Sequence, residues 1–187
     1  MAVKKTPKTE KTPRAEGERS EQKLETATFA EGCFWGVQDL FDRIKGVKES
    51  MAGYTGGKTE NPTYKDVCTD LTGHAEAVQL KFDPKVITYE KLLEVFFNSH
   101  DPTTLDRQGP DEGNQYRSAI FYHNAEQKKL AEKAKERFQK EYDRPIVTEI
   151  VPASKFYNAE EYHQKYDEKN GFSCHIIDME KIKHLLK

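Results

Sequence analysis

The motif GCFWG, residues 32–36, combines a thiol with the only tryptophan of this 187-residue chain. Residues 26–32 alternate as a short strand, and residues 34–44 then place apolar side chains at helical spacing. Cys33 therefore belongs to a strand-to-helix junction, where the positive end of the helix dipole favours the thiolate. Because the thiolate is the nucleophilic form, Cys33 is a candidate nucleophile; a buried structural cysteine is the alternative.

The elements that must position this thiol follow from apolar periodicity, caps and turn residues. After the first strand and helix, the pattern predicts strand 46–54, loop 55–64, strand 74–82, a helix from cap Thr88 to Asn98, polar loop 100–117, strand 118–123, helix 125–142, strand 146–151, and a last helix capped by Asn158 and Glu161 that ends near Lys169. This order begins as a split βαβ unit. We expect an α+β fold: a two-layer sandwich of mixed sheet and helices, with a ferredoxin-like split βαβ core and long functional loops.

Composition limits the class of protein. The 30 Lys and Arg nearly balance the 32 Asp and Glu, which argues against nucleic-acid binding, and no apolar run is long enough for a membrane span. The first 24 residues lack the apolar stretch of a secretory signal, and three cysteines suit a reducing compartment, so we expect a cytoplasmic protein. We expect a disordered polar tail over 1–25, a catalytic domain over 26–170 and a mobile C-terminal segment over 171–187.

The histidines give little support for a metal. The six histidines form no close pair of the H-x3-H type, and the cysteines are not paired, so we expect neither a metal nor a cofactor. A dyad of Cys33 and His74 stays open, because such partners meet in space and not in sequence. His163, in EYHQKY, is interpreted as a packing or hydrogen-bonding residue.

Six motifs occur in a fixed order along the chain: GCFWG, GYTGG, NPTY, GHAEAV, HDPTT and DRQGPDEGNQYRS. From about Thr26 to Cys174 the chain resembles the A-type peptide methionine sulfoxide reductases. The resemblance implies an enzyme that reduces methionine S-sulfoxide, free and in proteins, to methionine, as repair after oxidative stress. One departure is Asn114, where many relatives have Thr.

The chemistry of a sulfoxide needs an acid beside the thiolate, because the sulfur is a poor electrophile until its oxygen is protonated. Glu76, in the apolar-flanked strand GHAEAV, fits this role if burial keeps its carboxyl protonated. By resemblance, Tyr64 and Tyr116 donate hydrogen bonds to the same oxygen. The resemblance also assigns substrate binding to Phe34 and Trp35, which would receive the methyl group, and to Asp111, which either binds the substrate backbone or only holds its loop.

Turnover leaves a sulfenic acid on Cys33, which a second thiol would resolve. Cys174, in NGFSCHI, is the expected resolving cysteine because Gly171 and a mobile segment would bring it over Cys33. The resemblance implies that thioredoxin then reduces the Cys33–Cys174 disulfide. Cys68 is interpreted as a buried structural cysteine but stays a rival resolver, as does a glutathione-like reductant. We expect a monomer.

Two other functions fit the same thiol. In a thiol peroxidase, Cys33 would react with peroxide and Glu76 would be incidental. In a binding module, the protein would hold oxidised methionine without turnover, and it would keep its affinity when Cys33 is replaced by Ser.

Overall fold

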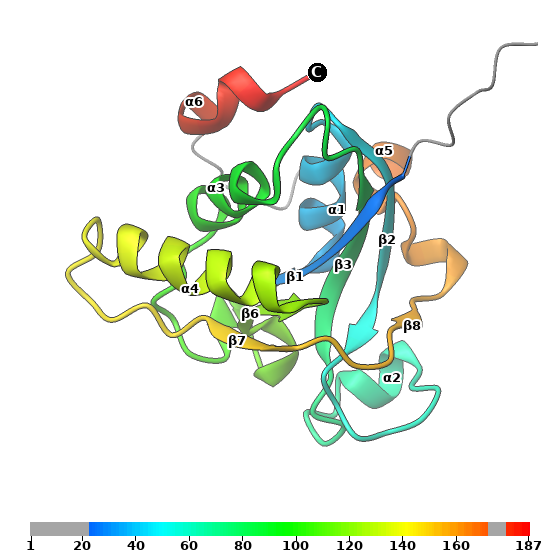
Figure 1. Ribbon diagram of the computed structural model, residues 1–187. Helices are drawn as coiled ribbons and strands as arrows, with labels where there is room; N and C mark the ends of the chain where they lie inside the picture. Colours follow the sequence, from blue (N-terminus) through cyan, green and yellow to red (C-terminus); the bar gives the residue numbers. More distant parts are fainter. Residues whose placement is uncertain (1–22, 172–178) are drawn as a thin grey trace, which may run out of the picture.

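The computed structural model describes residues 23–171 and 179–187, and most of the expected tail and Cys174 lie outside these ranges. The strands are β1 (Glu25–Glu31), β2 (Val47–Thr55), β3 (Ala75–Phe82), β4 (Arg107–Gln108), β5 (Asp111–Glu112), β6 (Ser118–Tyr122), β7 (Glu149–Pro152) and β8 (Tyr157–Asn158) (Figure 1). The helices are α1 (Phe34–Asp42), α2 (Tyr64–Val67), α3 (Tyr89–Ser99), α4 (Ala125–Gln139), α5 (Tyr166–Asn170) and α6 (Met179–Ile182), with 3-10 turns η1 (Asn114–Tyr116), η2 (Glu161–His163) and η3 (Lys183–Leu185).

The main sheet has the strand order β7-β6-β1-β3-β2-β8. Its neighbours pair antiparallel, except for β6 and β7, which pair parallel. Strand β3 lies between β1 and β2, which are joined through α1, so these elements form the split βαβ unit. The predicted α+β fold with a ferredoxin-like core is therefore confirmed, and β7 and β8 extend it at its two edges.

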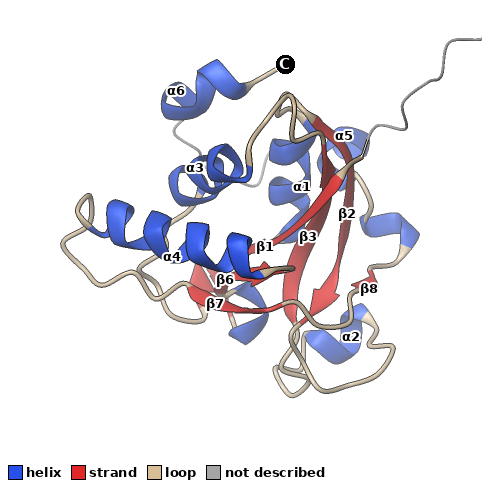
Figure 2. Cartoon of the chain, in the orientation of Figure 1, coloured by secondary structure: helices blue, strands red, loops and turns tan. Residues whose placement is uncertain are grey.

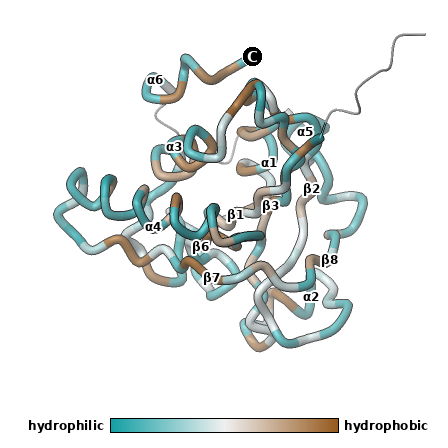
Figure 3. Tube along the Cα trace, in the orientation of Figure 1, coloured by the Kyte–Doolittle hydropathy of each residue, from teal (hydrophilic) through white to brown (hydrophobic). Residues whose placement is uncertain are grey.

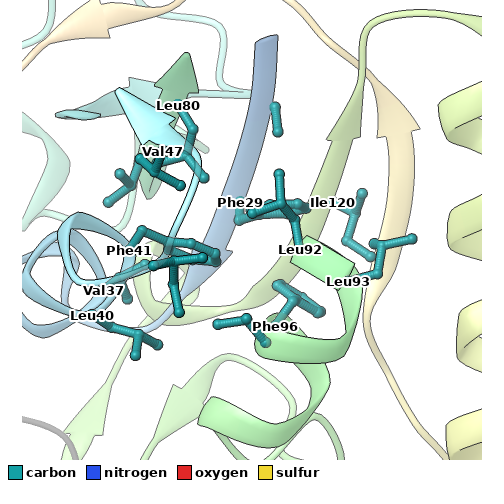
Figure 4. Packing of buried hydrophobic residues seen from close by; sticks show 14 of the residues in the cluster. Phe29, Val37, Leu40, Phe41, Val47, Leu80, Leu92, Leu93, Phe96 and Ile120 are labelled. Atoms are coloured by element: carbon teal, nitrogen blue, oxygen red, sulfur yellow. The ribbon is translucent and has the colours of Figure 1, made fainter. Parts of the chain in front are cut away.

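The main core lies between the sheet and helices α1, α3 and α4. Phe29 of β1 is its centre: its ring stacks on Phe41 of α1 at a centroid distance of 5.5 Å and lies 5.3 Å from Phe96 of α3 (Figure 4). Ala134 and Phe138 of α4 belong to the same cluster. Most of α4 is hydrophilic (Figure 3), and its buried side consists of Gln127, Ala131, Ala134 and Phe138.

A second, smaller cluster covers the other face of the sheet. It consists of small side chains and one large ring, Ala30, Ala75, Ala77, Ala119 and Phe121, with Ala153 and Phe156 packed against it. The segment after β7 thus crosses this face closely. Both faces of β3 are consequently buried at its start, where Glu76 lies.

The last predicted helix is wrong. Instead of one helix to Lys169, the chain forms η2, an extended Gln164, a left-handed Lys165 with φ +52°, and then α5. The buried Gln164 amide donates to the carbonyl oxygens of Ala52 (2.9 Å) and Ala159 (3.0 Å), and its oxygen accepts from the Ala52 N–H at 3.0 Å. These hydrogen bonds to a neighbouring strand hold Gln164 out of helical conformation.

The C-terminal residues contact the domain. Ile182 is buried, Ile44 pairs with Leu186, and the Lys187 N–H donates to the Arg43 carbonyl oxygen at 2.8 Å. The mobility expected for 171–187 stays a prediction. In the described part of the chain, no helix has the length and apolar character needed to span a bilayer.

Candidate active site

The strand register brings the predicted site residues to one end of the sheet. Glu31 pairs with Ser118, and Thr55 pairs with Ala75, so β1 and β2 end where β3 and β6 begin. The loops that follow or precede these strands gather around α2 at this end (Figure 2). Cys33, Tyr64, Asp111 and Tyr116 lie on these segments, and Glu76 lies near the start of β3 at the same end.

Cys33 is the N-cap residue of α1 and is half-buried. Its position at the helix N-terminus agrees with the prediction from the strand-to-helix junction, and the helix dipole there favours the thiolate. The preceding residue, Gly32, has φ +96°, which turns the chain from β1 into α1. The side chain of Gln108 packs directly against this glycine.

Glu76 lies beside the same helix end. One of its carboxyl oxygens accepts the Phe34 N–H at 3.1 Å, and the side chain is only 1% exposed. Burial raises the pKa of Glu76 to about 8; the Phe34 hydrogen bond opposes this shift, and the charge of Asp111 adds to it. Glu76 therefore holds a proton at neutral pH and adds no negative charge next to Cys33.

The two tyrosines retain their hydroxyl protons. Burial raises the pKa of Tyr116 above its ordinary value, and the charges of Glu76, Asp111 and Cys33 raise it further. Burial likewise raises the pKa of Tyr64, and a hydrogen bond with Cys68 raises it further. Both phenols are thus hydrogen-bond donors at neutral pH.

Asp111 lies on the β4–β5 hairpin, where it pairs with Gln108. The Gln108 amide accepts the Asp101 N–H at 3.2 Å and donates to the Asp101 carbonyl oxygen at 3.1 Å. This hairpin, which interrupts the predicted polar loop, connects Asp111 to Gly32 through one side chain. The position of Asp111 is therefore coupled to the turn that carries Cys33.

Phe34 and Trp35 belong to an aromatic cluster. Phe34 is 1% exposed, with its ring 5.7 Å from that of Tyr54, whereas Trp35 is half-buried and stacks on Tyr166 at a centroid distance of 3.7 Å. The Trp35 Nε1–H donates to Nδ1 of His163 at 2.9 Å. The interpretation of His163 as a packing and hydrogen-bonding residue is confirmed.

Sequence reasoning missed Glu160 and Tyr166. Glu160 accepts hydrogen bonds from the Tyr54 hydroxyl and the Tyr64 N–H, both at 2.9 Å, and thereby connects β2 and α2. The motif EYHQKY contains His163 and Tyr166, and Glu160 directly precedes it. This motif was the feature of the sequence that could have identified both residues.

Two other expectations are settled by the structure. His74 does not serve Cys33, because its Nδ1 accepts the Gly57 N–H at 3.1 Å and its Nε2 contacts the Thr59 carbonyl oxygen at 2.8 Å. The prediction of a buried Cys68 is wrong: it follows the short helix α2 at the surface and is exposed. Only its neighbour Val67 is buried.

Comparison with known proteins agrees with this geometry. The family model described as peptide methionine sulfoxide reductase matches residues 25–187. The chain is 59% identical to the peptide methionine sulfoxide reductase MsrA of Methanosarcina acetivorans, over 82% of this chain and 83% of that protein. It is 58% identical to MsrA of Acidobacterium capsulatum, over 80% of this chain and 98% of that one.

Solved structures show the same fold. Reduced Mxr1 from Saccharomyces cerevisiae superposes with a TM-score of 0.78 at 39% identity, covering 84% of this chain and 94% of that chain. Methionine sulfoxide reductase A of Corynebacterium diphtheriae gives 0.77 at 37% identity, covering 82% and 78%. The family model matches nearly the whole domain, these solved structures share its fold, and a buried acid lies beside a thiol. The chain therefore belongs to the peptide methionine sulfoxide reductase family.

Proposed function

We propose that Cys33 and Glu76 together reduce the S epimer of methionine sulfoxide, free and in proteins. The observation that supports this most directly is the buried Glu76 carboxyl at the N-terminus of α1, which accepts the N–H of Phe34, the residue after Cys33. A protonated acid and a thiol at one place are what sulfoxide reduction requires. If Cys33 were only a structural cysteine, no buried carboxyl would be needed beside it.

The first step transfers oxygen and two electrons. The Cys33 thiolate attacks the sulfoxide sulfur while Glu76 gives its proton to the sulfoxide oxygen. This attack forms a bond between the two sulfurs, and the protonated oxygen leaves the substrate sulfur as hydroxide. The hydroxide then attacks the Cys33 sulfur and breaks the bond between the sulfurs, so that methionine leaves with a reduced sulfur and Cys33 is oxidised to the sulfenic acid. Since one Glu76 oxygen accepts the Phe34 N–H, the other is available to carry the transferred proton.

Tyr64 and Tyr116 stabilise the charge that develops on this oxygen through their protonated hydroxyls. The half-buried Trp35 and the buried Phe34, which belong to one cluster, are the residues that receive the substrate methyl group in this scheme. An enzyme that holds the methyl group and the oxygen at separate places accepts only one epimer at sulfur.

The second step regenerates the thiol. Cys174 attacks the sulfenic sulfur, water leaves, and a Cys33–Cys174 disulfide forms. Cys174 is eight residues beyond Tyr166, which stacks on Trp35, and eight residues span at most about 28 Å. This tether keeps Cys174 within reach of the site. Because Cys68 is exposed and contacts Tyr64, it remains the rival resolver.

Thioredoxin is the reductant that we propose for this disulfide, in a monomeric cytoplasmic enzyme that binds no nucleic acid. The supporting observation is Mxr1, solved in complex with Trx2, which superposes on this chain with a TM-score of 0.56 at 33% identity.

Thiol counting without added reductant tests the whole scheme. The reduced enzyme is mixed with each separate sulfoxide epimer, and methionine formed and thiols lost are counted in the wild type, Cys174→Ser and Cys68→Ser. We expect only the S epimer to react, with two thiols lost in the wild type and Cys68→Ser, and one in Cys174→Ser. Loss of two thiols in Cys174→Ser but one in Cys68→Ser would assign resolution to Cys68.

The same assay separates the alternatives. A thiol peroxidase would consume peroxide but form no methionine from the sulfoxide. A binding module would form no methionine and would bind the sulfoxide equally well in Cys33→Ser. Either result would contradict the proposed scheme.

A further inference from the structure

The indole of Trp35 is held by two different contacts. Its face lies against Tyr166, with an interplanar angle of 10°, and its Nε1–H donates to Nδ1 of His163 at 2.9 Å. Stacking fixes the tilt of a ring but permits rotation within its plane, because the contact is similar at many angles. The hydrogen bond to His163 therefore determines which edge of the indole faces the site.

This hydrogen bond depends on the protonation of His163. Nδ1 accepts a hydrogen bond only when it carries no proton, so the neutral ring has its proton on Nε2. The imidazolium has protons on both nitrogens, and its Nδ1 would direct an N–H at the Trp35 N–H. The two donors would then repel each other, and the indole would lose this partner.

We propose that His163 is a positioning residue for Trp35, which holds the indole in its substrate-binding orientation only while the imidazole is neutral. The inference rests on the proposed role of Trp35 in receiving the substrate methyl group. Because protonation of His163 breaks this hydrogen bond, substrate binding weakens at acidic pH through a residue that does not itself touch the reacting atoms.

The surroundings of His163 favour its neutral form. The side chain is 2% exposed, and its ring contacts Phe34 of α1 at 5.2 Å and Tyr64 of α2 at 4.5 Å. Burial lowers the pKa of His163 below its ordinary value, and the charge of Glu160 opposes this shift. The imidazole is consequently neutral at neutral pH.

Glu160 is the nearest charged group, with Oε2 4.0 Å from His163 Nε2, which is beyond hydrogen-bond distance. It is already bound by the Tyr54 hydroxyl and the Tyr64 N–H. The titratable rings against His163 are those of Tyr64, at 4.5 Å, and Tyr162, at 4.1 Å in the same turn. Both carry no charge at neutral pH, so Glu160 is the charged group that stabilises the imidazolium.

Tryptophan fluorescence tests the inference directly, because Trp35 is the only tryptophan. The measurement uses Cys33→Ser protein, in which the Cys33 thiolate cannot quench the indole, and lowers the pH from about 7 to about 5, below the range in which Glu76 releases its proton. We expect one emission change with a midpoint below the ordinary histidine value of about 6.5. Adding His163→Asn should abolish it, because the Asn oxygen replaces Nδ1 as acceptor but does not titrate.

His163→Phe keeps the ring packing but removes the acceptor. At neutral pH its emission should match that of the acidified parent protein. His123→Asn is the matched control, because burial also lowers the pKa of His123, which lies on the other side of the fold bound to Thr28. This variant should keep the emission change of its parent.

Steady-state kinetics with the S-sulfoxide provide the second readout, in enzymes that retain Cys33. Loss of one hydrogen bond should raise KM about fivefold in His163→Phe, while His163→Asn stays close to the wild type. The inference is overturned if the emission change persists in His163→Asn, if His163→Phe emits like the neutral parent, or if kcat falls while KM is unchanged. The fluorescence measurement needs no turnover, so its outcome is independent of whether the proposed reaction occurs.

Discussion

The environment of Glu76 explains how a carboxylic acid can act as a proton donor near neutral pH. Glu76 lies near the start of β3, where both faces of the sheet are covered, and its carboxyl accepts a hydrogen bond from a backbone N–H of α1. Desolvation therefore outweighs the hydrogen bond and raises its pKa to about 8. As the pH rises through this pKa, Glu76 loses its proton and can no longer donate it to the substrate.

Glu76→Gln should lower kcat by two to four orders of magnitude, the usual contribution of a general acid. The Gln oxygen can still accept the Phe34 N–H, so the loss reports the proton and not the local structure. In the wild type, single-turnover rates should fall as the pH rises through about 8, and this alkaline limb should vanish in the variant. Glu31→Gln is the control, since this buried acid faces Ser99 and should leave the limb in place.

Asp111→Asn tests whether the charge of Asp111 acts on Glu76. Its negative charge contributes to the raised pKa of Glu76, so its removal should move the alkaline limb to lower pH. Glu112→Gln, at the exposed neighbouring position of β5, should not move the limb. A change in KM with an unmoved limb would instead show that Asp111 acts only on the substrate.

At the scale of elements, the β1–α1 junction and the β4–β5 hairpin form one unit. Gly32 turns the chain into α1 with φ +96°, and a Cβ at this position would lie 2.6 Å from Cβ of Gln108. The hairpin that contains Gln108 also carries Asp111. A disturbance at Gly32 must therefore displace the thiol, the hairpin or both.

Gly32→Ala should destabilise the protein by about 3 kcal/mol, from backbone strain together with the clash against Gln108. Gly109→Ala is the matched control: it also has positive φ, +57°, but no heavy atom would lie within 4 Å of its Cβ. It should cost only about 1 kcal/mol. Urea denaturation measures both values, and equal losses would show that Gln108 yields without cost.

At the scale of the whole molecule, two buried acids make stability depend on pH. Burial raises the pKa of Glu31 and of Glu76 to about 8, from an ordinary value of 4.5. Between these values the folded protein keeps protons that the unfolded chain has released. The free energy of unfolding must therefore decrease as the pH rises through this window.

This decrease should be clearest between about pH 6.5 and about pH 8, because buried histidines oppose it at lower pH. Its upper limit is about 1.4 kcal/mol per pH unit for each acid. Urea denaturation across this range should show a shallower decrease in Glu31→Gln than in the wild type. The same slope in both proteins would mean that Glu31 does not keep its proton.

The sequence by itself was sufficient for the local features. The strand and helix around GCFWG, the Thr88 cap and the ferredoxin-like order depend on neighbouring residues, whose periodicity and turn chemistry are visible in the chain. The ordered motifs also pointed to Cys33 and Glu76. The predictions of these elements and of their order hold because each rests on contacts within a few residues, or on strands whose order permits one compact arrangement.

Features that depend on distant partners became visible in the folded structure alone. Gln164 interrupts the last predicted helix because its amide bonds to Ala52, and His163 meets Trp35 across 128 positions of sequence. Cys68 is exposed because the short helix before it lies at the surface. Burial and long-range hydrogen bonds arise from strand register and packing, which no local pattern of residues encodes.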